Sequence, residues 1–95
     1  MLIEITGDVE LKRLIGIDSG FLLDANYPLN LVTIHMINCK LCNPENNANV
    51  SPSNKRQSKI GEIWYSDKHQ TIYSKAKEIS EKRGCIISSC KACNP

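Results

Sequence analysis

The sequence has few of the residues that fill a large core and no segment suited to crossing a membrane. Aromatic residues make up only 5% of the 95 residues. A domain this short buries only about 60–65% of its unfolded surface, so its core is thin. Such domains often need a disulfide or a bound metal ion for stability. There is no run of about 18 apolar residues, and no basic start followed by an apolar stretch. We therefore expect a single domain over residues 1–95, cytoplasmic and not bound to a membrane.

The motifs of common enzyme classes are also absent. The sequence has no phosphate-binding loop, no nucleophile elbow, and no set of histidines and carboxylates at the spacing of a catalytic zinc site. We therefore do not expect an enzyme.

Strong net charge is missing as well, but the charge is unevenly distributed. The formal net charge of +2 is too small by itself to indicate a nucleic-acid-binding protein. Residues 1–38 carry two basic and five acidic side chains, whereas residues 39–95 carry ten basic and five acidic ones. This asymmetry indicates either an anionic partner or a lysine-rich surface that keeps a small protein in solution.

The cysteines are the most informative residues present. Four of the five form two C-x2-C pairs, Cys39 with Cys42 and Cys90 with Cys93, separated by 47 residues. The surroundings repeat too, because residues 39–44 and 90–95 are identical at five of six positions. Two residues between cysteines let a tight turn aim both sulfurs at one ion, and two such turns supply the tetrahedral set that Zn²⁺ takes in closed structural sites. The sequence therefore predicts a zinc site formed by two knuckles.

Other uses of these cysteines fit less well. A disulfide framework suits a secreted protein, but the cysteine count is odd. A thioredoxin-like pair opens a helix, whereas Asn-Pro follows each pair here and opposes a helix. An iron–sulfur cluster also uses four thiolates and stays open as an alternative.

Two further residues are candidate replacements for one of these ligands. His35 lies four residues before Cys39 and would give a site of one histidine and three cysteines, although we favour a strand histidine held by local hydrogen bonds. Cys85 follows Gly84 and is expected to be a free, buried cysteine that acts as a small hydrophobic residue.

The hydrophobic pattern predicts an α+β fold. We expect a small zinc-stapled domain with a short mixed sheet of about five strands and two helices. The expected strands cover residues 2–5, 21–23, 29–37, 60–65 and 85–88. One helix is expected to begin at Asp8 and end at Gly16, and the other to be capped by Asp67 and end at Gly84.

A long polar stretch over residues 43–59 has no hydrophobic pattern and predicts a flexible loop. Basic residues lie at its end and beside the two cysteine pairs. They are candidates for contacts with nucleic-acid phosphates, the alternative being a solvated run of charge: Lys40, Lys55, Arg56, Lys59 and Lys91.

The 57 residues from Cys39 to Pro95 resemble the N-terminal zinc domain of the Ada DNA-repair family. In that family a cysteine pair is followed by a strand, a helix that ends in glycine, and C-x2-C-x-Pro. The matching stretches here are Cys39 with Cys42, residues 62–65, the helix ending at Arg83-Gly84, and residues 90–95. The resemblance implies a four-cysteine zinc, contact with the DNA backbone, and a zinc-bound cysteine that accepts a methyl group from a phosphotriester, which by position is Cys39.

Three hypotheses about function follow. The first is a structural zinc domain that binds nucleic acid without catalysis. The second is a zinc-stabilised module for protein–protein contacts, as a monomer or as a homodimer formed through exposed strand edges. The third is acceptance of a methyl group by a zinc-bound thiolate.

Overall fold

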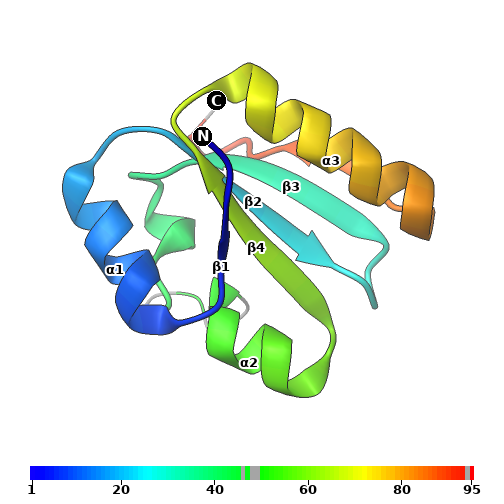
Figure 1. The fold of residues 1–95 in the computed structure, drawn as a ribbon, viewed down its shortest axis with the longest axis horizontal. Coiled ribbons are helices and arrows are strands. Elements are labelled where there is room, and N and C mark those ends of the chain that lie inside the picture. The colour runs from blue at the N-terminus through cyan, green and yellow to red at the C-terminus, as the bar shows by residue number, and fades with distance from the viewer. Residues whose placement is uncertain (46, 48–49, 94) are drawn as a thin grey trace.

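A computed structural model describes residues 1–45, 47, 50–93 and 95. It has one five-stranded sheet with helices on both faces (Figure 1). No helix among these residues is long and apolar enough to span a membrane. In chain order the elements are β1 (Ile3–Ile5), α1 (Asp8–Ile17), β2 (Phe21–Asn26), β3 (Leu31–Met36), the short 3-10 helix η1 (Lys40–Cys42), α2 (Pro52–Ser58), β4 (Gly61–Ser66), α3 (His69–Arg83) and β5 (Ile86–Ser89).

The sheet is mixed, with the strand order β1-β4-β2-β3-β5. Neighbouring strands pair antiparallel except β3 and β5, which are parallel. In this parallel pair Ile34 lies opposite Ser89, so the chain leaves both strands at the same end of the sheet. The two loops that carry the C-x2-C pairs therefore start side by side.

The face of the sheet under α3 has an apolar core. Leu23 and Ala25 of β2 lie beside Val32 and Ile34 of β3, and successive strand residues alternate between faces. From above, α3 adds the buried side chains Ile72, Ala76 and Ile79. Cys85 is buried in this same cluster, which confirms the prediction that it acts as a small hydrophobic residue.

The opposite face is covered by α1 and α2 and holds the other cysteines. Leu11 and Leu14 of α1 pack on Leu22, Ile63 and Tyr65 of the sheet in one cluster. The same cluster includes Cys39, Cys42 and Cys90. This core therefore merges with the region that would hold a metal.

The predicted fold class is confirmed, since the protein is α+β with a mixed five-stranded sheet. The structure corrects the expectation of a loop over 43–59, part of which lies outside the described residues, because α2 occupies its second half. This helix has a local start signal. The Ser51 side chain accepts a hydrogen bond from the Asn54 backbone N–H at 3.3 Å, and Pro52 follows in the first turn. Without an apolar stripe, its sequence shows no helical periodicity.

Several expected helix ends differ in the structure. The helix α1 continues through Gly16 to Ile17, and Asp18 takes the left-handed conformation at its end, with φ of 61°. Asp8 is the first helical residue, and its carboxylate accepts a hydrogen bond from the Ser51 hydroxyl at 2.9 Å, which ties α1 to α2. Lys68, not Asp67, precedes α3, whereas Gly84 ends α3 in the left-handed conformation as predicted.

Candidate metal centre

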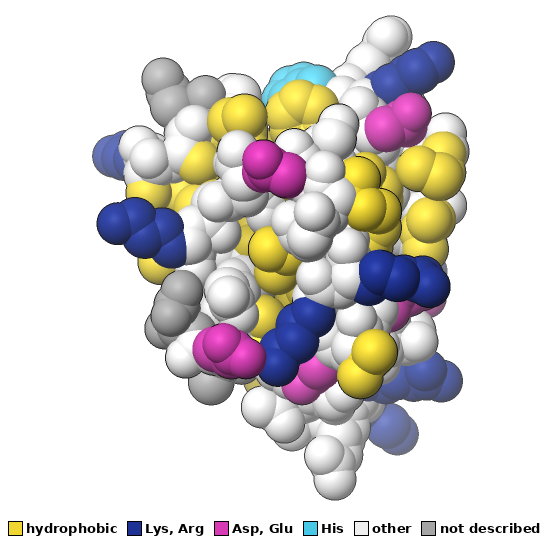
Figure 2. All heavy atoms as spheres, turned by 90° about the vertical axis from the view of Figure 1, so that its left-hand side faces the viewer, with side chains coloured by type: hydrophobic (Ala, Val, Ile, Leu, Met, Phe, Trp, Pro, Cys, Tyr) yellow, Lys and Arg dark blue, Asp and Glu magenta, His cyan; other side chains and the backbone are white. Residues whose placement is uncertain are grey.

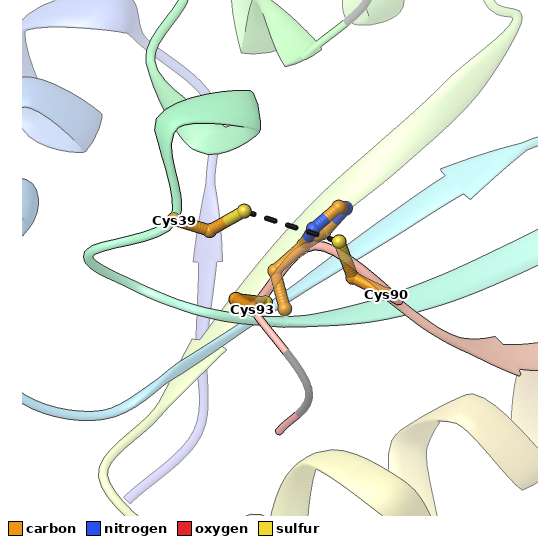
Figure 3. Close-up of side chains that lie close together, drawn as sticks. Cys39, Cys90 and Cys93 are labelled. Carbon is orange, nitrogen blue, oxygen red and sulfur yellow. Dashed lines mark hydrogen bonds between the residues drawn. The ribbon is translucent and has the colours of Figure 1, made fainter.

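Four side chains that could bind a metal ion converge at the end of the parallel strand pair. His35 lies near the end of β3, Cys39 follows β3, and Cys90 and Cys93 follow β5. One ligand atom from each lies within 4.8 Å of the ligand atoms of all the others. Figure 3 shows the three cysteine side chains pointing toward one another from these two segments. This cluster, here called the His/Cys cluster, can hold a metal ion.

The sulfur spacing fits a shared ion better than a disulfide. The Sγ atoms of Cys39 and Cys90 are 3.9 Å apart. Two sulfurs at about 2.3 Å from one tetrahedral ion are separated by about 3.8 Å, whereas a disulfide bond is about 2.05 Å long. All five cysteines are free thiols.

His35 has an unsatisfied nitrogen inside the protein. It is 5% exposed, and its Nδ1 is buried without a hydrogen-bond partner in the part of the chain that the structure describes. The expectation that local hydrogen bonds hold this histidine is therefore wrong for Nδ1. Burial lowers the pKa of the imidazole, and the Asp24 carboxylate opposes part of that effect. A neutral imidazole keeps one nitrogen lone pair for a metal, and buried polar atoms without partners are uncommon.

Cys42, which the sequence predicts as a ligand, lies next to the cluster but is not one of its four members. Its side chain is 0% exposed, and its Sγ donates a hydrogen bond to the Met36 carbonyl at 3.3 Å. Burial raises the pKa of this thiol, and the neighbouring sulfur of Cys39 raises it further. The structure therefore brings together His35 with three of the four predicted cysteines and gives Cys42 a different partner.

The second C-x2-C turn shifts the thiol pKa values of its two cysteines in opposite directions. At Cys90, burial raises the thiol pKa, but hydrogen bonds from the backbone N–H groups of Cys93 and Ala92, together with those from the Cys93 and Cys39 side chains, outweigh it and lower the pKa overall. At Cys93, burial dominates and raises the pKa to about 11. The Met36 backbone N–H donates to the Cys93 Sγ at 3.3 Å. Backbone N–H groups aimed at sulfur in this way stabilise a thiolate, the form that binds metals.

The turn after the first pair differs from the expectation for a knuckle. Asn43, expected to favour a left-handed conformation, has φ of −85°. Its counterpart Asn94 lies outside the described residues.

One of the predicted basic residues is buried. Lys40, Arg56, Lys59 and Lys91 are exposed. Lys55 is 2% exposed, and its Nζ lies 2.8 Å from Asp24 Oδ1 and donates to the Ala25 carbonyl at 2.9 Å. This corrects the candidate list, because the buried Lys55 ammonium cannot reach a phosphate. The face that carries α1 has basic, acidic and hydrophobic side chains intermixed (Figure 2).

Sequence reasoning did not identify Asp24 as part of this region. Asp24 is the one charged residue of β2, in the segment Phe21–Asn26, and it lies on the same face of the sheet as His35. A carboxylate in an otherwise uncharged and mostly apolar strand is a signal that a buried cation lies nearby. The sequence does not say which lysine supplies that cation.

Comparisons with known proteins give no further assignment. No protein-family model, no curated protein and no solved structure matches this chain.

Proposed function

We propose that this protein is a structural zinc-binding domain in which His35, Cys39, Cys90 and Cys93 hold one Zn²⁺ ion. The observation that carries the proposal is the buried imidazole of His35, which has a nitrogen within 4.8 Å of three thiols and whose Nδ1 has no hydrogen-bond partner among the described residues. One imidazole nitrogen with three thiolates is a ligand set that zinc takes in closed tetrahedral sites. Three thiolates and Zn²⁺ together carry a net charge of −1, which a largely buried site tolerates better than the −2 of four thiolates.

The bound ion would join distant parts of the chain. Cys39 and Cys90 are 51 residues apart in the sequence, and the strand before Cys90, β5, is a four-residue edge strand. A metal bond at this point would hold that strand and the C-terminal turn against β3. Metal binding to a site of this kind contributes directly to folding free energy. Four protein ligands leave no position for a water molecule, so the proposed role is structural and not hydrolytic.

Metal content of the purified protein tests the proposal, measured by native mass spectrometry on the wild type, three serine variants and His35→Gln. Cys90→Ser removes a cluster ligand and should abolish zinc binding at equimolar metal. Cys42→Ser removes the adjacent thiol and should leave one zinc bound. Cys85→Ser is the matched control, because Cys85 lies in the other core cluster.

Two outcomes would contradict this assignment. Loss of zinc in Cys42→Ser together with retention in His35→Gln would restore the four-cysteine set. Iron in place of zinc, with visible absorption from an iron–sulfur cluster, would replace the structural-zinc proposal.

Nucleic-acid binding is a second candidate function. It is favoured by the exposed positions of Lys40 and Lys91, each directly after a cysteine of the cluster, and of Arg56 and Lys59. A gel shift over a range of salt concentrations tests it. Binding that depends on phosphate contacts weakens with a log–log slope of about −0.7 to −0.9 per phosphate neutralised. No shift at low salt with either single or double strands would exclude this function.

The remaining candidates stay predictions. They are a protein-interaction module, as monomer or homodimer, and the methyl acceptance at Cys39 that the resemblance to the Ada family implies. Incubating the zinc-loaded protein with a methyl phosphotriester and finding a gain of one methyl mass on Cys39 would support the latter.

A further inference from the structure

The aromatic side chains differ in how their ring faces are covered. Tyr65 is buried in the core, and its hydroxyl donates to the Ser19 carbonyl at 2.6 Å. The Lys75 ammonium lies 4.1 Å from the centre of the Trp64 ring. The Arg83 guanidinium lies 3.7 Å from the centre of the Tyr27 ring. Burial or a cation therefore already occupies a face of each of these rings.

Two exposed rings, those of Tyr73 and His69, form a row where α3 begins, and the half-buried ring of Phe21 lies against them. Tyr73 is 45% exposed, and its ring lies nearly parallel to that of His69, at 17° with centroids 6.4 Å apart. His69 is itself exposed and contacts Phe21 edge to face, at 81° with centroids 5.2 Å apart. Phe21 belongs to β2, so the sheet supports this row from below. Flat rings held in place on a rigid element are suited to stacking against other flat rings.

Lysines predominate along the first turns of α3, in a stretch that Asp67 and Glu78 flank. Residues 68–77 contain three lysines and no acidic residue. His69, Tyr73 and Lys77 are spaced four residues apart along α3, so they lie on one side of the helix. Lys75 forms an ion pair with Glu78 at 3.0 Å, and its ammonium lies over the Trp64 ring. Lys77 lies one helical turn after Tyr73 on the same side of α3. Aromatic faces flanked by ammonium groups are complementary to unpaired bases joined by phosphates.

We propose that this α3 ring face, made of Phe21, His69, Tyr73 and Lys77, binds single-stranded nucleic acid. The inference rests on the nucleic-acid binding proposed above and names its surface and its class of ligand. A single strand fits better than a duplex because paired bases are already stacked on one another and do not offer their faces. This surface lies on the opposite side of the sheet from α2, which carries Arg56 and is followed directly by Lys59 (Figure 1).

Fluorescence anisotropy of the zinc-loaded full chain tests the proposal. The probes are a labelled single strand of about 20 nucleotides, long enough for a site of about 4–16 nucleotides, and a duplex of equal length. We expect at least tenfold tighter binding of the single strand. Tyr73→Ala should weaken it by about 5- to 150-fold, the loss expected for one stacked base, whereas Tyr73→Phe should stay within about twofold of the wild type.

Two charge variants test whether nucleic-acid phosphates contact this surface and not the other side of the sheet. Lys77→Gln should reduce the magnitude of the salt slope by about 0.7, the value for one phosphate contact on a single strand. Arg13→Gln removes the same charge from α1, on the other side of the sheet, and should leave the slope unchanged. Zinc content and thermal unfolding of each variant show whether it is folded. If Tyr73→Ala does not fold, His69→Ala replaces it as the variant that removes a ring.

The failures are distinguishable. Single-strand binding that is unchanged in Tyr73→Ala and in Lys77→Gln would overturn the proposed surface and leave nucleic-acid binding standing. Equal affinity for the duplex would overturn the single-strand assignment. No binding of either probe would remove the nucleic-acid function itself. If the chain then self-associates in sedimentation and Tyr73→Ala abolishes the association, the face is a contact between copies.

Discussion

Lys55 Nζ lies 2.8 Å from Asp24 Oδ1, in an ion pair that joins α2 to the central strand β2. Both side chains are largely withdrawn from water, and within the described residues Asp24 Oδ1 has no hydrogen bond besides this ion pair. Lys55 is therefore a structural residue of the face that holds the His/Cys cluster. The Ala25 carbonyl gives the same ammonium a second partner.

Breaking this pair from one side should destabilise the protein strongly. Lys55→Met keeps much of the side-chain volume but leaves the Asp24 carboxylate without its cation, which costs about 3–5 kcal/mol for a buried pair. Urea unfolding of the zinc-loaded protein measures the effect. The double variant Lys55→Met with Asp24→Leu should recover most of the loss, because both charges are then gone. A single variant within 0.5 kcal/mol of the wild type would show that the pair is solvated.

Two glycines should respond to alanine in opposite directions. Gly20 has φ of +112°, and a Cβ there would lie 2.6 Å from the Tyr65 hydroxyl oxygen. Gly20→Ala should therefore cost about 2–4 kcal/mol from backbone strain and crowding. Gly16 lies inside α1, and a Cβ there meets no atom within 4 Å. Gly16→Ala should stabilise the protein by about 0.5–1 kcal/mol, the helix preference of alanine over glycine. Thermal unfolding of both variants measures these changes in stability. A Tm that rises in Gly20→Ala and falls in Gly16→Ala would contradict the backbone geometry.

Metal removal should loosen the C-terminal turn first. If zinc binds as proposed, a hundredfold excess over Kd adds about 2.7 kcal/mol of stability, so chelation should lower Tm by roughly 10–20 °C. Hydrogen exchange should accelerate at Met36, whose N–H donates to Cys93, and at Cys90, whose N–H donates to the Ile34 carbonyl. The amide of Ile63 in β4 is the control and should exchange as before. Unchanged exchange at Met36 would show that the turn is held without a metal.

Tyr27 should give the protein a stability that is lost at high pH. Burial raises the pKa of its phenol above the ordinary value of 10, and the hydrogen bond to Glu62 raises it further. A raised pKa means that folding favours the protonated phenol. This contribution is therefore complete below pH 10 and decreases as the pH rises from 10 toward the folded-state pKa.

The measurement is denaturant unfolding at pH 9 and pH 11, compared between the wild type and Tyr27→Phe. The wild type should lose more stability between these pH values than the variant, because the variant lacks this ionisation. Equal losses in both proteins would place Tyr27 in contact with solvent.

Local patterns in the sequence were sufficient for much of the fold and part of the candidate site. Alternation of apolar residues predicts the strands, and a buried stripe of Ile72, Tyr73, Ala76 and Ile79 with Gly84 predicts α3 and its end. The prediction is wrong for Tyr73, which is 45% exposed. These signals lie within a few residues of the elements they specify, so they can be read without knowing the fold. The spacing of the two C-x2-C pairs likewise places a metal site on the two turns.

Tertiary structure alone decided which groups meet there. The parallel register of β3 and β5 brings Cys90 and Cys93 to the end of β3, where the side chain of His35 lies on the same face. Cys42 has the same spacing signal as Cys93, yet its sulfur bonds to the Met36 carbonyl instead. The sequence predicts Lys55 as a surface charge. In the structure it is buried and forms an ion pair with Asp24, which lies 31 residues earlier in the chain. The His/Cys cluster and the Lys55–Asp24 pair depend on contacts between distant segments, whose geometry is set by strand pairing and burial, not by neighbours in the chain. Cys42 lies only six residues after Met36, and it is the local backbone of the turn that places its sulfur on that carbonyl.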